Sequence, residues 1–122
     1  MKKLFPVFVI LLFVLFYNSC TKDKTPTPPD CIQADTLNTY TKSVKPIMDN
    51  YCAMGGCHDA VTAFSGVRLD TYEFTVDAAQ NQPKFFCVTE QSCTPYMPYL
   101  SGKLADSLIT KITTWKANCY PQ

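Results

Sequence analysis

Several common catalytic signatures are missing from this sequence, which has one histidine and four glycines among 122 residues. It has no glycine-rich phosphate loop, no serine nucleophile motif and no close C-x-x-C pair. The carboxylates in the middle of the chain show no spacing typical of an acid/base pair; they are Asp59, Asp70, Glu73 and Asp77. We expect these carboxylates to be solvated, and we do not expect an enzyme that depends on any of these groups.

An excess of charge of one sign is also absent. Eleven Lys and Arg stand against ten Asp and Glu, which gives a formal net charge of +1 at pH 7. A chain this close to neutral produces no field that would collect phosphates. Nucleic acid is therefore not expected as a partner.

A long apolar run opens the chain. Lys2 and Lys3 precede residues 4–17, of which only Pro6 is not apolar. A membrane-spanning helix needs about 20 apolar residues, so this layout indicates a secretory signal over residues 1–19. The protein is expected to be exported.

Cys20 follows the small residue Ser19 at the end of this run. Its position resembles that of the lipid-acceptor cysteine of bacterial lipoproteins, which implies a lipid anchor on the periplasmic or cell-surface side of a bacterial membrane. Ordinary cleavage nearby, which would leave a soluble protein, is the alternative. Residues 20–30 contain three prolines and, after Cys20, no side chain to bury, as is typical of a tether. The folded domain is expected over residues 31–122.

Two segments of this domain have the apolar spacing of an amphipathic helix. The first is a short stripe that runs directly into Cys52, with Pro46 in its first turn: Val44, Ile47, Met48 and Tyr51. The second predicts a helix over residues 105–117, on the stripe Leu104, Leu108, Ile109, Ile112 and Trp115. Residues 80–98 contain three prolines and little periodicity, and we expect mostly loop there. The fold class is therefore mostly α.

The chemistry is concentrated at Cys52, Cys57 and His58. Two thiols followed by an imidazole can attach both vinyl groups of a haem and ligate its iron from one loop. The usual attachment motif has two residues between the cysteines, whereas this one has four. Because the porphyrin fixes the distance between the vinyl carbons, the two extra residues must bulge, and Gly55 and Gly56 have the conformational freedom to do so.

At these residues the sequence resembles the c-type cytochromes, in particular exported lipoprotein variants with a C-x4-C-H motif. The resemblance covers most of residues 43–118. It rests on VKPIMDNYC (44–52), GGCH (55–58), YMP (96–98) and KITTWK (111–116). It implies a small cytochrome c-like helical domain with long loops, in which the helix before the haem motif crosses a C-terminal helix.

The resemblance also implies the roles of individual residues. Cys52 and Cys57 match the thioether positions of one covalently attached haem c. His58 matches the proximal iron ligand, and Met97, in a Met-Pro loop, matches the distal ligand. The function that this implies is transfer of one electron between a donor and an acceptor redox protein, without catalysis.

Three other interpretations remain open from the sequence. Cys52 and Cys57 form a disulfide if the chain is an exported binding module without haem. A structural zinc site would need four protein ligands, with other cysteines completing the set. An open sixth iron position would indicate a haem enzyme or a gas sensor instead of an electron carrier.

The remaining cysteines of the domain permit three pairings; they are Cys31, Cys87, Cys93 and Cys119. The five-residue gap between Cys87 and Cys93 favours a local bridge, directly ahead of the Met97 loop. This leaves Cys31 and Cys119 to join the two ends of the domain. We expect both bridges to stabilise the fold.

Overall fold

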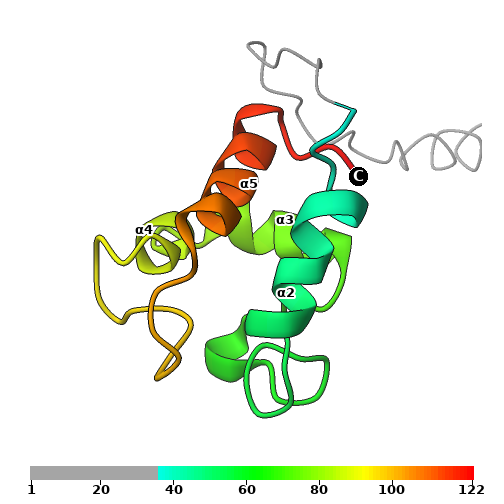
Figure 1. The fold of residues 1–122 in the computed structure, drawn as a ribbon. Helices are drawn as coiled ribbons and strands as arrows, with labels where there is room; N and C mark the ends of the chain where they lie inside the picture. The colour runs from blue at the N-terminus through cyan, green and yellow to red at the C-terminus, as the bar shows by residue number, and fades with distance from the viewer. Residues whose placement is uncertain (1–35) are drawn as a thin grey trace, which may run out of the picture.

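The computed structural model describes residues 36–122. The predicted signal, Cys20, the tether and Cys31 lie outside the described residues. The elements in chain order are η1 (Tyr40–Val44), α2 (Lys45–Tyr51), η2 (Phe64–Gly66), α3 (Tyr72–Asn81), α4 (Phe85–Thr89) and α5 (Asp106–Ala117) (Figure 1). Residues 36–122 contain no strand, so the described part is a mostly helical domain with long loops, as predicted. No helix in this part is long and apolar enough to cross a membrane.

The helix predicted before Cys52 is present as α2, and Pro46 lies in its first turn. A π-helical turn, η1, precedes it without a break and is capped by Thr39, whose hydroxyl accepts a hydrogen bond from the amide of Lys42. Proline is tolerated there because the first amides of a helix have no partner within it. The buried side of the η1–α2 segment consists of Tyr40, Val44, Ile47 and Met48.

The terminal helix α5 begins one residue later than predicted and ends at the predicted Ala117. Asp106 lies in its first turn, where it also pairs with Lys103, and Lys116 lies in its last turn. Both charges are placed as the helix dipole favours. Ile112 and Trp115 are fully buried, so the apolar stripe faces the core as expected.

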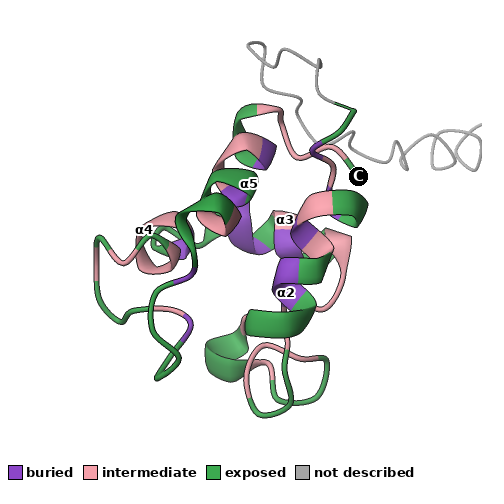
Figure 2. Ribbon diagram, viewed as in Figure 1, coloured by how far each residue is buried: buried purple, intermediate pink, exposed green. Residues whose placement is uncertain are grey.

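The two ends of the domain pack against each other where η1 meets α5. The rings of Tyr40 and Trp115 lie 5.9 Å apart between centroids. The carbonyl oxygen of Pro121 accepts hydrogen bonds from the indole Nε1 of Trp115 (2.9 Å) and from the amide of Tyr40 (2.8 Å). Buried residues lie on the facing sides of α2, α3 and α5 (Figure 2). The segment that leads into the candidate site is therefore fixed to the core.

Two helices lie outside the segments predicted as helical. α3 is capped by Thr71, whose hydroxyl accepts from the amide of Phe74, and its buried face consists of Thr75, Ala78 and Ala79. α4 lies inside residues 80–98, so the prediction of mostly loop there is wrong at Phe85–Thr89. Phe85 is buried and anchors this single turn to the core.

Candidate functional site

Cys52 is placed by the end of α2. Its amide and that of Ala53 both donate to the carbonyl oxygen of Met48, a buried core residue, over 2.9 and 2.7 Å. The Cys52 side chain packs against the core. This burial raises the pKa of the Cys52 thiol to about 12, and the nearby Cys57 adds to the effect. The first candidate attachment residue thus sits at the inner edge of the loop.

The expanded loop is closed by its own backbone. The amide of His58 donates to the carbonyl oxygen of Cys52 over 3.1 Å, and the amide of Cys57 donates to Met54 over 2.9 Å. Of the two glycines, Gly56 uses its conformational freedom, with a φ of +86°, while Gly55 has no positive φ. The bulge expected at these glycines stays a prediction. Cys52 and Cys57 are both free thiols in this closed loop.

The ring of His58 is oriented by a residue that the sequence did not single out. Nδ1 lies 3.0 Å from the carbonyl oxygen of Val67. A carbonyl oxygen can only accept, so Nδ1 carries the hydrogen and Nε2 of the neutral ring keeps a lone pair for a metal. The ring also makes an edge contact with Phe64, 6.3 Å between centroids. The carbonyl oxygen of His58 accepts from the amide of Leu69 over 2.9 Å.

Two of the carboxylates expected to be solvated also have specific hydrogen-bond partners. Asp59 accepts hydrogen bonds from the amides of Gly56, Val61 and Thr62. Bonds of this kind stabilise the ionised form, and they hold the pKa of Asp59 well below its usual range. Asp70 forms a two-point ion pair with Arg68, which lowers the pKa of that carboxyl. The sequence signal for Asp59 is its residue type alone, because an Asp in a turn often accepts from backbone amides a few residues further along the chain.

Met97 lies on a different loop, after α4, and its side chain is half-buried. Its amide donates to the carbonyl oxygen of Val88 over 3.0 Å. The structure therefore brings Cys52, Cys57 and His58 together in one loop and places Met97 on another. In Figure 1 the two loops lie in the lower half of the view, one after α2 and one after α4.

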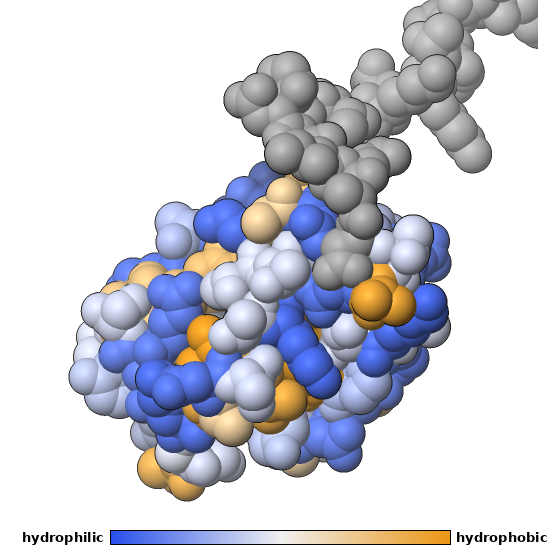
Figure 3. All heavy atoms as spheres, turned by 45° about the horizontal axis from the view of Figure 1, so that its top comes forward, coloured by the Kyte–Doolittle hydropathy of each residue, from blue (hydrophilic) through white to orange (hydrophobic). Residues whose placement is uncertain are grey.

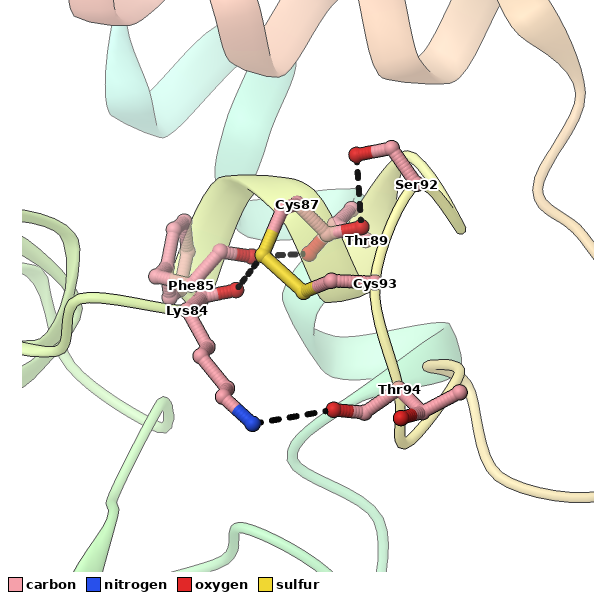
Figure 4. The surroundings of a disulfide bond; sticks show 7 residues. All are labelled: Lys84, Phe85, Cys87, Thr89, Ser92, Cys93 and Thr94. Atoms are coloured by element: carbon pink, nitrogen blue, oxygen red, sulfur yellow. Dashed lines mark hydrogen bonds between the residues drawn. A yellow bond between two sulfur atoms is a disulfide. The ribbon is translucent and has the colours of Figure 1, made fainter.

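The predicted bridge between Cys87 and Cys93 is present and closes the turn ahead of Met97 (Figure 4). The amide of Cys93 donates to the carbonyl oxygen of Cys87 over 3.3 Å, and Lys84 Nζ donates to that of Thr94 over 3.2 Å. Cys119 is also disulfide-bonded. Its predicted partner Cys31 lies outside the described residues, so that pairing stays a prediction.

Large apolar side chains are exposed mainly on these two loops. Seven of the nine in the described chain lie on these loops or at the helix ends that border the first of them: Tyr51, Met54, Val61, Phe64, Tyr96, Tyr99 and Leu100. The face that carries the domain ends is mostly hydrophilic, with small separate apolar patches (Figure 3). Exposed apolar side chains are therefore concentrated on the segments of the chain that carry the thiols, the imidazole and the thioether.

The donors at these loops are two thiols, one imidazole and one thioether. Imidazole and thioether are both axial ligands of haem iron, and paired thiols suit covalent attachment, so the donor set fits a haem. Within residues 36–122 no three His, Cys, Asp or Glu side chains cluster as a metal-binding group. No family model, curated protein or solved structure matches this chain.

Proposed function

We propose that this chain is an exported, covalent haem protein that transfers single electrons, with a domain similar to that of c-type cytochromes. The observation that carries the proposal is the hydrogen bond between His58 Nδ1 and the carbonyl oxygen of Val67. It fixes the tautomer that a proximal ligand needs, in the same loop as two free thiols. A histidine that merely occupied the surface would not need its ring oriented in this way.

In this proposal the two cysteines, the histidine and its hydrogen-bond partner have separate roles. Cys52 and Cys57 hold the haem edge through thioether bonds, and His58 holds the iron through Nε2. Val67 orients the imidazole and, by accepting its hydrogen, makes Nε2 a better donor. A bound haem supplies an iron that changes between the ferrous and ferric states, which is the electron-transfer chemistry.

Met97 is the proposed distal ligand. The bond to Val88 and the Cys87–Cys93 bridge fix the backbone on its N-terminal side, and Pro98 after it is buried. A restrained loop loses less entropy when it presents a flexible thioether. The apolar side chains exposed on the two loops are of the kind that contact a porphyrin and exclude water from it.

The arrangement of the helices supports a cytochrome c-like domain. The segment that leads into Cys52 packs against the C-terminal helix through Tyr40 and Trp115. The loop that carries Met97 lies between these two elements in the chain. The same order of elements is implied by the family resemblance. The proposed partners are a donor and an acceptor redox protein, and a lipid on Cys20 holds the domain at a bacterial membrane.

Haem attachment is tested by producing the full chain with a cytochrome c maturation system that accepts expanded motifs. A denaturing gel stained for haem peroxidase activity should show a band at the mass of the processed protein. The band should be absent from the Cys52→Ser, Cys57→Ser double variant and retained in Cys87→Ser, Cys93→Ser. A colourless wild type with the mass of the polypeptide alone would contradict the proposal and favour a disulfide-stapled binding module.

The anchor is tested separately by cell fractionation. If Cys20 carries acyl chains, the protein should sediment with membranes and become soluble in Cys20→Ala, because each buried methylene contributes about 0.8 kcal/mol. A processed wild type that stays soluble would contradict the lipid anchor and leave the haem proposal untouched.

A further inference from the structure

The carboxylate of Asp59 bonds the backbone on both sides of the Cys57-His58 pair. Oδ2 accepts from the amide of Gly56 over 3.0 Å. Oδ1 accepts from the amides of Val61 (2.7 Å) and Thr62 (3.0 Å). One side chain therefore fixes the start and the end of the segment that carries the second thiol and the imidazole.

These bonds act at the point where the motif departs from the usual spacing. Gly56, one of the residues in the enlarged interval, takes a φ of +86°, and Asp59 holds its amide in that bend. The bond from His58 N to Cys52 O closes the same loop from the other end. A longer interval between the cysteines has more conformations available, so it needs additional restraints to keep one of them.

The neighbouring contacts extend this restraint to the histidine ring. The amide of Ala63 donates to the carbonyl oxygen of Asp59, and the amide of Phe64 donates to that of Cys57. Phe64 in turn contacts the ring of His58 at its edge. A turn centred on Asp59 thus places both the Cys57 backbone and one wall of the imidazole.

We infer that Asp59 is a positioning residue that holds the C-x4-C-H loop in the conformation required for haem attachment. The inference rests on the proposed function for its purpose, but the restraint itself is a property of the polypeptide. Asp59 touches neither haem nor iron in this role. Its effect is to keep Cys57 and His58 in a fixed relation to Cys52.

The test compares Asp59→Ala and Asp59→Asn with the same changes at Asp77. Asp77 is an exposed carboxylate on α3 that accepts from the side chain of Asn81, a residue of the same helix. The first measurement is amide hydrogen exchange by NMR in the haem-free full chain. In Asp59→Ala, exchange at Gly56, Val61 and Thr62 should accelerate on the order of tenfold, since bonds to a charged acceptor are lost.

The second measurement is the fraction of chains that carry covalent haem, taken from intact mass. Asp59→Ala should lower this fraction. Asp59→Asn should restore part of it, because the amide oxygen can replace one carboxylate oxygen. Both Asp77 variants should match the wild type. The emission of Trp115, which is buried in the core, should be unchanged in every haem-free variant and so report an intact fold.

The outcomes distinguish the positioning role of Asp59 from the proposed haem-binding function. Wild-type haem attachment combined with unchanged exchange in Asp59→Ala would overturn the role of Asp59. A wild type that never acquires haem, with exchange accelerated at the three amides, would overturn the proposed function and leave Asp59 as the restraint of a loop with another purpose. Loss of haem in the Asp77 variants as well would also overturn the inference, because the effect would not be specific to the site loop.

Discussion

The backbone amide of Met97 donates a hydrogen bond to the carbonyl oxygen of Val88, which lies on the same turn of α4 as Cys87. The disulfide to Cys93 and this bond thus attach the loop to one short helix at two places. That helix is itself anchored by the buried Phe85. The thioether of Met97 is therefore presented from a backbone fixed to the core, although it lies in a loop.

Replacing this thioether should change the iron environment in the haem-bearing protein. In Met97→Ala we expect loss of the weak red absorption band typical of sulfur-to-iron ligation, a lower reduction potential and binding of carbon monoxide. Absorption spectra of the oxidised protein and of the reduced protein under carbon monoxide measure these effects.

Met54→Ala is the matched control, because Met54 is exposed and lies inside the attachment loop. It should keep the spectra and the potential of the wild type. A wild type that already binds carbon monoxide readily, or unchanged spectra in Met97→Ala, would assign the sixth position differently and favour sensing or catalysis.

The disulfide ahead of Met97 should contribute to stability. The bridge joins residues six apart in the sequence, and the chain-entropy model gives a loop of this size about 2 kcal/mol. We expect the Cys87→Ser, Cys93→Ser variant to lose about that much free energy of unfolding, measured in urea by the emission of Trp115. Ser92→Ala, an exposed change in the same turn, should alter it by less than about 0.5 kcal/mol. Equal stability of the double variant and the wild type would contradict the prediction.

Elements with large apolar side chains at helical spacing could be predicted from the sequence. α2 and α5 have such stripes. As predicted, α2 ends directly before Cys52, and α5 begins one residue later than predicted and ends at the predicted Ala117. The buried face of α3 instead carries Thr75, Ala78 and Ala79, whose small or polar side chains give a weak hydropathy signal. α4 is one turn long, and a single turn has no periodicity to detect.

In the candidate site, the features that depend on side-chain type could be predicted, and those that depend on the backbone could not. The thiols, the imidazole and the local Cys87–Cys93 bridge follow from residue types and spacing. The partner of His58 is a backbone carbonyl, that of Val67, and every residue has one, so no sequence pattern identifies it. The bonds of Asp59 depend on the bend at Gly56, which exists only once the loop is folded.

The buried thiol should react slowly in the haem-free protein. Because burial raises the pKa of Cys52 to about 12, almost none of it is thiolate at pH 8, and the thiolate is the nucleophile. Iodoacetamide should therefore modify Cys52 on the order of 1,000-fold more slowly than a cysteine in a short peptide, whose thiol has a pKa of about 8.5. Peptide mapping at several times measures the rate.

Cys57→Ser provides the control for this reaction. This variant removes the smaller cause of the raised Cys52 pKa, the charge interaction with Cys57, and leaves the larger cause, the burial of the Cys52 thiol. Iodoacetamide should thus still modify Cys52 slowly in that variant. Reaction of Cys52 at the rate of the reference peptide would show that the loop opens readily and would contradict the closed arrangement.

The haem-free protein should lose stability in alkaline solution. Burial is the main cause of raised pKa values at Cys52 and at three tyrosines of the core region, Tyr40, Tyr72 and Tyr120. Above about pH 9 the unfolded chain releases these protons first, so it binds fewer protons than the native state. The free energy of unfolding must then fall as the pH rises, over a range that extends to about pH 12 for Cys52.

For Cys52 alone the expected fall is about 2 kcal/mol between pH 9 and 11. Urea unfolding at each pH, followed by the emission of Trp115, measures it. Cys52→Ala removes this thiol and should have a shallower dependence, with the tyrosines as the remaining cause. The haem-bearing protein should also be less sensitive, because a thioether has no proton to release. A free energy of unfolding that stays constant from pH 9 to 11 in the haem-free wild type would show that neither the thiol nor the tyrosines are shielded by the fold.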